Sequence, residues 1–482
     1  MNLLNKLRGN TVVKNFSYVT IGSITAQLIN LIALIKIARA FSPNTYGTYT
    51  FMSVQAQLLF TLADLGLRNI IVRTIARNKS TTNDMVFNGI LIRICSITLF
   101  SAIYYLYNRF EGSLSTNYVL LICIYAFFNC ISSLFETAFW GHQKMLPAAI
   151  VNVSTSLLWL GAVYVLPLKS LTIQNLFIIL LVINLVLTGT IYFIVLKYQK
   201  LLIGKVQPFI KSSTAILKES WPYFLLILIG LPFGYLTNNY LDLNSTKPEI
   251  GYFNLTQKLM SPVSMVITFS LSALFPNLSS LWISDPDKFG RLLSKGIKFF
   301  MMGALLMCFI FTVFAGEVIT LLFNKSYYPV IRIAQVQVWY VFLMGTNSLI
   351  GTIWGATNNE KKFVKSTFIN VCISAPLLYI GSKYGALGLS YGYVVSFALF
   401  EIYLWRDFKK SVSMKLPEDK VLWLIAISLF LVSYFLLNQV NWIWKSGLSI
   451  LIISALSYYL FSVSKKMPAV KAGETPVEDA PL

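Results

Sequence analysis

The sequence has very few of the side chains that metal sites and soluble catalytic sites use. Its 482 residues include one histidine, His142, which excludes a multi-histidine metal site. The five cysteines all fall in long apolar stretches without metal-ligand spacing, so we interpret them as small buried hydrophobic side chains. No nucleotide-binding loop or catalytic motif is visible. We therefore expect neither an enzyme nor a protein with a bound metal or cofactor.

Charge is scarce as well. Charged residues make up 12% of the chain and hydrophobic residues 56%, whereas soluble domains carry about 25% charged residues. Apolar runs such as 176–187, in which Asn184 is the single polar residue, are long, which favours membrane-spanning helices over the short alternating strands of a barrel. We predict an all-α polytopic membrane protein with about 14 transmembrane helices. The predicted spans lie near residues 14–39, 46–66, 84–107, 117–140, 146–167, 172–196, 218–241, 250–281, 296–323, 331–356, 364–383, 386–405, 420–437 and 444–464.

The basic residues predict an orientation. If the spans alternate, the loops on the side of the N-terminus hold 28 Lys and Arg residues and the opposite loops hold 8. Because cytoplasmic loops of membrane proteins are enriched in these residues, both termini are expected in the cytoplasm. This asymmetry accounts for most of the net charge of +21. The charge is spread over short loops, so we expect no nucleic-acid partner.

The chain also repeats itself. Tyr46-Gly47 follows the first predicted span and Gly251-Tyr252 follows the seventh, each as a Gly-aromatic entry to the next helix. Trp140-Gly141 and Trp354-Gly355 close the fourth and tenth spans. We predict two pseudo-symmetric six-helix bundles plus two C-terminal helices, an arrangement that suggests alternating access. The predicted domains are residues 1–205, residues 206–410, the two additional helices in 411–466, and a polar cytoplasmic tail in 467–482.

Several short motifs, in order along the chain, carry a family resemblance. They are Asn15-Phe16-Ser17-Tyr18, Ala38-Arg39-Ala40-Phe41-Ser42-Pro43, Asp64-Leu65-Gly66-Leu67, Arg73-Thr74-Ile75-Ala76-Arg77 and Glu136 with Trp140-Gly141. The chain resembles the polysaccharide transporter family of O-antigen and capsule repeat-unit flippases. This resemblance implies translocation of an undecaprenyl-diphosphate-linked oligosaccharide from the inner to the outer leaflet of the bacterial cytoplasmic (inner) membrane. It also implies membrane lipid and the polysaccharide polymerase machinery as partners.

Cations within the predicted spans are the first candidates for contacts with such a substrate, because intramembrane charges are usually functional. Lys36, Arg93 and Lys258 are our best candidates for binding a diphosphate or a sugar acid. Arg39 is a further candidate, although it lies at the end of the first span and could equally reach the outer headgroups. Among the aromatic residues, Tyr235 and Trp339 are candidates for stacking on sugar rings, with membrane-interface anchoring as the alternative.

Three acidic residues are candidates for ion coupling or gating. Asp64 could couple an ion or pair with Arg68 one helical turn on. Glu136 could gate the inner mouth or pair with Lys144, and Glu317 is a weaker coupling candidate. With no nucleotide-binding loop, energy would come from coupling to H⁺ or Na⁺ or from consumption of the product.

Other assignments remain open. A drug/cation antiporter of the same superfamily would have a carboxylate-dominated cavity, whereas the mid-span charges Arg93 and Lys258 are cationic. A lipid II flippase fits fourteen spans, but its characteristic arginine cluster is not found. A membrane glycosyltransferase or polymerase would need a large extramembrane loop with paired acids, which this chain lacks. Gly230-Leu231-Pro232 interrupts the seventh span, and there we favour a hinge.

Overall fold

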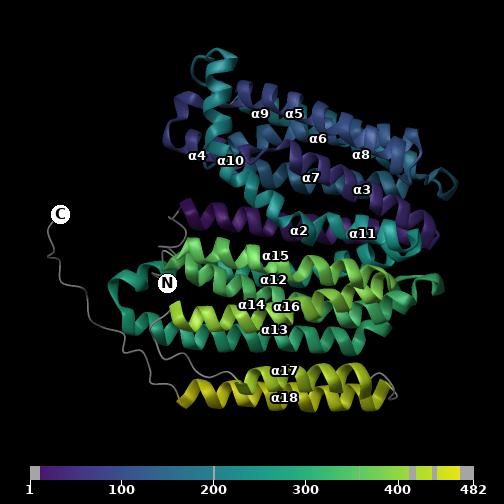
Figure 1. Cartoon of the computed structure of the whole chain (residues 1–482), viewed down its shortest axis with the longest axis vertical. Coiled ribbons are helices and arrows are strands. Elements are labelled where there is room, and N and C mark those ends of the chain that lie inside the picture. Colours follow the sequence, from purple (N-terminus) through teal and green to yellow (C-terminus); the bar gives the residue numbers. More distant parts are fainter. Residues whose placement is uncertain (1–10, 199–200, 358, 412–419, 437–441, 467–482) are drawn as a thin grey trace.

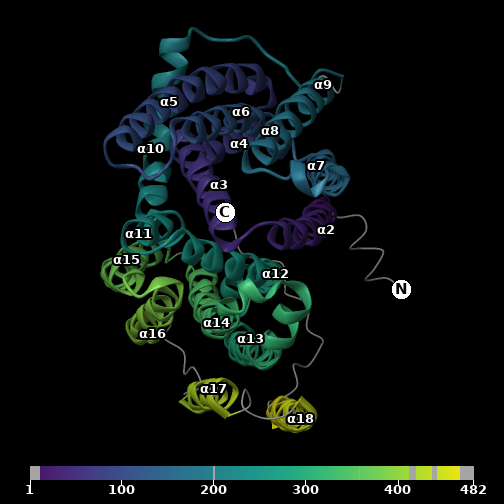
Figure 2. The same cartoon turned by 90° about the vertical axis from the view of Figure 1, so that its right-hand side faces the viewer.

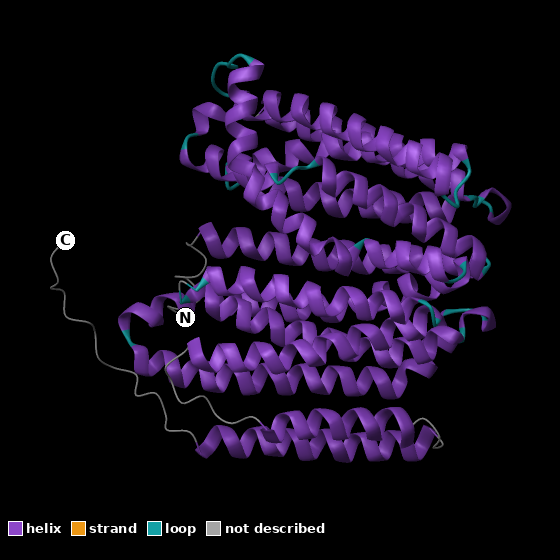
Figure 3. Ribbon diagram, in the orientation of Figure 1, coloured by secondary structure: helices purple, strands orange, loops and turns teal. Residues whose placement is uncertain are grey.

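The computed structural model of the chain describes residues 11–198, 201–357, 359–411, 420–436 and 442–466. Within these ranges the secondary structure is helical and no strand is present (Figure 3). The all-α fold predicted from the sequence is therefore confirmed. The tail predicted for 467–482 lies outside the described residues.

The helices form two groups that lie one above the other (Figure 1). The first half consists of α2 (Thr11–Ala40), α3 (Pro43–Ala63), α4 (Leu67–Arg77), α5 (Thr82–Glu111), α6 (Thr116–Gly141), α7 (Met145–Val165), α8 (Ile173–Val182) and α9 (Thr190–Tyr198). The second half consists of α11 (Leu236–Asn244), α12 (Lys247–Ser284), α13 (Pro286–Leu322), α14 (Pro329–Ala356), α15 (Glu360–Ser382) and α16 (Gly385–Ser411). Helix α10 (Phe209–Gly234) packs against α4 and α5 of the first half and α15 of the second, and so joins them.

The last two helices lie at the edge of the second half. Viewed along the helix axes, α17 (Lys420–Leu431) and α18 (Trp442–Lys466) sit below α13 and α16 (Figure 2). Both pack against α13. The edge of the molecule at which α2 begins is called the N face, and the opposite edge is called the far face.

Nine helices of the described chain are long and apolar enough to cross a membrane by length and composition. Shorter apolar helices add Ile173–Gly189, Leu422–Phe435 and Ile443–Tyr458. These helices establish a multi-pass membrane protein, whereas the count of fourteen spans stays a prediction. Helices α3 and α12 are not among the nine, and both direct polar side chains into the interior of the molecule.

One break in the helices has a local cause. Between α3 and α4, Leu65 and Gly66 have φ angles of 50° and 75°. A Cβ atom at Gly66 would lie 2.8 Å from the Cβ of Tyr223 on α10, so glycine permits both the left-handed backbone and the close approach of that helix. At Gly230-Leu231-Pro232 the helix is not interrupted, because α10 continues through Pro232 and ends at Gly234. A hinge in this region stays a prediction.

The two halves make a close backbone contact where α3 crosses α12. A Cβ atom at Gly47 would lie 1.7 Å from the carbonyl oxygen of Lys247, and one at Gly251 would lie 3.0 Å from the backbone nitrogen of Gly47. Only residues without a side chain allow helices to approach this closely. The two glycines of the sequence repeat therefore meet at the crossing point of the two halves.

Candidate functional site

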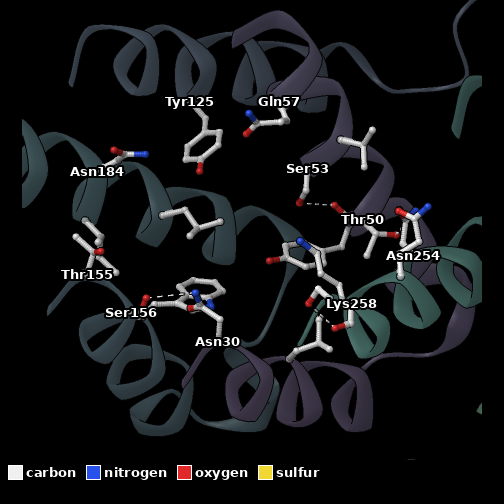
Figure 4. A pocket seen from close by; sticks show the side chains of 18 of the residues that line it. Asn30, Thr50, Ser53, Gln57, Tyr125, Thr155, Ser156, Asn184, Asn254 and Lys258 are labelled. Carbon is white, nitrogen blue, oxygen red and sulfur yellow. Dashed lines mark hydrogen bonds between the residues drawn. The ribbon is translucent and has the colours of Figure 1, made fainter. Parts of the chain in front are cut away.

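A polar cavity lies between the halves, beside this crossing. Its volume is about 680 Å³. Helices α2, α3, α6, α7, α11 and α12 and the segment Ile183–Gly189 all contribute side chains, which converge on the hollow in Figure 4. Three of the helices do so through residues at positions i, i+3, i+4 and i+7, which share one helix face. These are Thr50, Ser53, Val54 and Gln57 of α3, Asn152, Thr155, Ser156 and Trp159 of α7, and Asn254, Gln257, Lys258 and Ser261 of α12.

Amide and hydroxyl side chains form the polar part of the wall. Five asparagines and two glutamines line the cavity, at positions 30, 152, 184, 238 and 254 and at positions 57 and 257. Some of them hold one another in place: Asn254 donates to Asn238 at 2.6 Å, and Asn30 donates to Ser156 at 3.2 Å. Amides and hydroxyls both donate and accept hydrogen bonds. Such a wall can satisfy a ligand that carries many hydroxyl groups.

Lys258 is the one formally charged residue among the described residues that line this cavity. No ion pair or hydrogen bond of its ammonium group is present in the described part of the chain, and the side chain reaches into the hollow beside Asn30 (Figure 4). A smaller space of about 210 Å³, lined in part by Gln27, adjoins it and shares Asn30 and Lys258. A lone ammonium group in a polar cavity favours an anionic ligand.

A π-helical turn widens the wall opposite Lys258. The segment Ile183–Gly189 between α8 and α9 is π-helical, and Asn184 and Thr188 within it line the cavity. Turns of this kind are rare and occur frequently at functional sites. Here the turn directs two polar side chains inward from a helix that is otherwise apolar.

A side chamber extends the cavity within the first half. It measures about 220 Å³ and shares Asn152 and Asn184 with the main cavity. Glu136 lines it. The Glu136 carboxylate accepts from the indole nitrogen of Trp140 at 3.2 Å and lies 3.6 Å from the guanidinium of Arg68. The chamber therefore places one paired carboxylate close to the amide-lined space.

At the far face, side chains of one half bind the backbone of the other. Arg39 of α2 donates to the carbonyl oxygens of Leu321 and Leu322, at 2.8 and 2.7 Å, and so caps the C-terminal end of α13. Asn324 donates back to the Arg39 carbonyl at 3.0 Å, and Tyr327 donates to the carbonyl of Phe41 at 3.0 Å. These contacts fasten the two halves together on the far side of the cavity.

Two of the residues predicted as substrate contacts line the cavity. They are Lys258 and Tyr235, whose hydroxyl lies 2.9 Å from that of Thr61. Arg39 lies instead among the far-face contacts with α13. Lys36 donates to the carbonyl of Tyr164 at 3.0 Å, and its ammonium group lies 4.6 Å from the centre of that ring, so it holds the end of α7.

Arg93 and Trp339 do not line this cavity. Arg93 is 1% exposed and forms an ion pair with Asp64, while its guanidinium also donates to the carbonyl of Cys130 at 2.8 Å. Trp339 donates to the Thr312 hydroxyl at 3.0 Å. The structure thus separates Arg93 from Lys258, which the sequence had grouped together.

The three predicted coupling acids all have cationic neighbours. Asp64 pairs with Arg93, Glu136 lies near Arg68, and Glu317 accepts from Lys445 of α18 at 2.8 Å. The last pair ties the C-terminal helices to α13. A role for any of the three in ion coupling stays a prediction.

Sequence reasoning missed the amide residues because it searched for charge. The sequence itself contains a polar stripe at helical spacing, formed by Asn254, Gln257, Lys258 and Ser261. Glu401 of α16 was expected near the inner membrane interface and not among the site residues. The structure buries it, at 3% exposure, without a cationic partner among the described residues.

This architecture, two repeated helical halves around a polar cavity, is that of a secondary membrane transporter. A family profile described as "Polysaccharide biosynthesis protein" matches residues 12–282, which is more than half of the chain. The protein therefore belongs to the polysaccharide biosynthesis protein family, and the resemblance drawn from the sequence motifs is confirmed. A second profile, described as "Lipid II flippase MurJ", matches residues 249–461.

Individual relatives agree with this assignment. The chain is 23% identical over 403 residues to the capsular polysaccharide biosynthesis protein CapF of Staphylococcus aureus, covering 80% of this chain and 96% of that protein. The fold is similar to the lipid II flippase MurJ in its inward closed conformation, with a TM-score of 0.72, 16% identity and coverage of 94% and 98%. It is also similar to an inward-facing multidrug resistance transporter of the MATE family, with a TM-score of 0.60, 15% identity and coverage of 80% and 94%.

Proposed function

We propose that this protein is a flippase for an undecaprenyl-diphosphate-linked oligosaccharide, such as an O-antigen or capsule repeat unit. It moves this lipid from the inner to the outer leaflet of the bacterial cytoplasmic membrane. The observation that carries the proposal is the amide-lined cavity with Lys258 as its single charge among the described residues. Membership of the polysaccharide biosynthesis protein family supports the substrate class.

The wall of the cavity fits a sugar head group. Moving a hydroxyl into an apolar medium without a hydrogen bond costs roughly 2–7 kcal/mol, so a bare bilayer opposes passage of an oligosaccharide. Amides and hydroxyls from several helices replace the lost water, and aromatic rings such as those of Trp159, Tyr125 and Tyr235 offer apolar faces for the sugar rings. The cavity volume lies within the range of ordinary ligand pockets.

Lys258 supplies the complementary charge for the diphosphate. Lysine binds phosphate as a point charge, and it does so most strongly where water is scarce. No carboxylate among the described cavity-lining residues competes for it. The same composition argues against a drug/cation antiporter, because a cationic drug would meet an uncompensated ammonium group.

The charge asymmetry of the loops favours a cytoplasmic N face. The contacts of Arg39 with α13 then lie on the outer side, and the described state is fastened there. Alternating access requires those contacts to break while the halves pivot near the α3–α12 crossing. The product leaves in the outer leaflet, where polymerase machinery would consume it.

A cellular experiment tests the proposal. Cells lacking the gene should accumulate a lipid-linked saccharide on the inner leaflet, and the intact gene should clear it. Lys258→Ala should restore surface polymer poorly. Lys288→Ala, which removes only an exposed pair with Asp285, should restore it fully.

Two outcomes would count against this assignment. Accumulation on the outer leaflet would contradict the flippase function. Accumulation of lipid II, without any change in surface polysaccharide, would transfer the protein to the lipid II flippases.

A further inference from the structure

A second, apolar groove lies away from the cavity, between α14, α16 and α17. Its volume is about 510 Å³. The rings of Trp339, Phe342, Trp405, Trp423 and Phe430 line it. Glu401 of α16 lines it as well, and its side chain is almost fully buried. A carboxyl group in such surroundings is costly to keep ionised, because little in the groove wall replaces its water.

The hydrogen bonds of Glu401 can be arranged in two ways. The Thr346 hydroxyl lies 2.6 Å from Glu401 Oε1 and 2.7 Å from the carbonyl oxygen of Leu343, but it has one hydrogen to donate. If Glu401 is neutral, its own hydrogen goes to Thr346, which then donates to Leu343. If Glu401 is ionised, it takes the hydrogen of Thr346 instead.

The second oxygen of Glu401 is compatible with both arrangements. Oε2 has no hydrogen-bond partner in the described structure, nor has the indole nitrogen of Trp405, which lies one helical turn further along α16. That indole can donate to a carboxylate oxygen or to the carbonyl oxygen of a neutral acid. The geometry therefore accommodates both protonation states of Glu401.

Glu401 differs from the three acids predicted to couple an ion. Asp64, Glu136 and Glu317 each have a cation within 4 Å, and no ion pair of Glu401 is present among the described residues. It also differs from the buried Asp84 of α5, whose carboxylate accepts hydrogen bonds from Asn88, Ser212 and the backbone nitrogen of Gln207. No charged side chain of α12, α14 or α17 lines the groove in the described part of the chain. Among the side chains that the structure describes, the charged residues of the adjoining helix ends are Lys361, Lys362 and Lys365 of α15 and Arg406, Asp407, Lys409 and Lys410 of α16.

We propose that Glu401 is the proton-binding site that couples this transporter to a proton gradient. The inference rests on the flippase function proposed above. Glu401 binds one proton from the outer side, and the neutral acid is compatible with the closed groove and with halves fastened at the far face. The proton is released toward the N face, where Lys409 lines the same groove. The carboxylate that remains favours the arrangement of the halves in which the far-face contacts are broken.

A proton fits this site better than a metal cation. Hard cations are held by several oxygen ligands, commonly six or more. The described wall of the groove offers the Glu401 carboxyl, with the Thr346 hydroxyl beside it, among aromatic and aliphatic side chains. Such a site can hold a proton on one oxygen but cannot replace the hydration shell of a sodium ion.

Infrared difference spectroscopy of the full-length protein in nanodiscs, titrated across pH, tests proton binding without any substrate. Wild-type protein should show the band of a protonated carboxyl that disappears at alkaline pH. Glu401→Gln should lose this band, and Glu401→Asp should keep a shifted one. Glu317→Gln is the matched control, because it removes a paired membrane carboxylate, and it should leave the band unchanged. A band that persists in Glu401→Gln would overturn the proposal.

Proteoliposomes then test coupling. Transport by the wild-type protein should accelerate with an imposed pH gradient, and transport by Glu401→Gln should not respond to that gradient. A full response in Glu401→Gln would overturn the coupling role. If no variant moves a lipid-linked saccharide under any condition, the flippase proposal fails, and the infrared result alone still decides whether Glu401 binds a proton.

Discussion

Helices α3 and α12 occupy equivalent places in the two halves, yet only one of them is charged where it meets the cavity. They cross at Gly47 and Gly251, which are 204 positions apart. The same step relates the two cavity stripes residue by residue: Thr50 to Asn254, Ser53 to Gln257, Val54 to Lys258 and Gln57 to Ser261. All eight residues line the cavity. The repeat thus builds a symmetric scaffold, and one position, valine in α3 and lysine in α12, breaks that symmetry.

The surroundings of the two helices differ in the same sense. Beside α3, the first half is hollow and lined by amides. Beside α12, the second half is filled by aromatic rings, with Phe253 stacked on Tyr393 at 5.9 Å and Tyr340 at 4.6 Å from the same ring. Related folds can therefore serve different purposes within one chain, binding in one half and rigid packing in the other. Substitutions in the two halves test this contrast, beginning with the largest expected effect.

The first prediction separates a structural cation from a functional one. Arg93→Leu should lower the free energy of unfolding by about 3–5 kcal/mol, because it leaves Asp64 buried without its partner. Lys258→Leu should not lower it, because the Lys258 ammonium group has no ion pair or hydrogen bond among the described residues. Thermal or chemical denaturation in detergent measures both variants. Arg93→Leu combined with Asp64→Asn should recover part of the loss, and equal losses for Arg93→Leu and Lys258→Leu would contradict this distinction.

The second prediction concerns a substitution that gives α12 the valine found at the corresponding position of α3. Lys258→Val should reduce transport roughly 10- to 100-fold, since a hydrogen bond to a charged group contributes about 1.5–3 kcal/mol. The exchange variant, Lys258→Val with Val54→Lys, returns one cation to the cavity from the opposite helix and should recover part of the rate. Transport in proteoliposomes is the measurement. Full activity of Lys258→Val would remove Lys258 from the binding site.

The third prediction concerns the crossing itself. Gly47→Ala should destabilise the protein by roughly 1–3 kcal/mol, because the new methyl group would meet the backbone of Lys247 and force the halves apart. Gly251→Ala should cost less, because its nearest atoms lie 3.0 Å away. Melting temperatures of the two variants test the order. A reversed order would show that the two glycines are not packed as described.

The smallest effect on stability is expected at His142, which follows the C-terminal end of α6. His142 follows Trp140-Gly141 in the first half, and Ala356 stands at the equivalent place after Trp354-Gly355. The His142 ring nitrogen lies 2.9 Å from the Thr82 hydroxyl, and burial, together with Lys79 and Lys144, lowers the pKa of His142.

A histidine whose pKa is lower in the folded state is more easily protonated when unfolded. The stability of the first half should therefore fall slightly as the pH drops below about 6.5. His142→Gln should weaken this dependence, as measured by melting at several pH values. An unchanged pH dependence in that variant would assign the effect to other groups.

Most of the fold could be predicted from the sequence, but most of the site could not. Long apolar runs predict helices because the bilayer forces every backbone group to pair within its own segment. The Gly-aromatic and Trp-Gly repeats pointed to two related halves. Lys258 and Tyr235 were found for the right reason, since polar groups are rare in apolar helices and tend to line cavities. Arg93 has the same signature, yet Asp64, 29 positions earlier in the chain, draws it into an ion pair.

By itself, the sequence determined a helical membrane protein, its family and its internal repeat, because these follow from composition, periodicity and short motifs. Only the tertiary structure decided which polar groups face one another. It separated Lys258, which lines a polar cavity, from Arg93, which is buried in an ion pair with Asp64. Among the described residues, neither Lys258 nor Glu401 has an ion-pair partner. The reason is physical: the consequence of burying a charge depends on the partners within a few ångströms, and those partners come from distant parts of the chain.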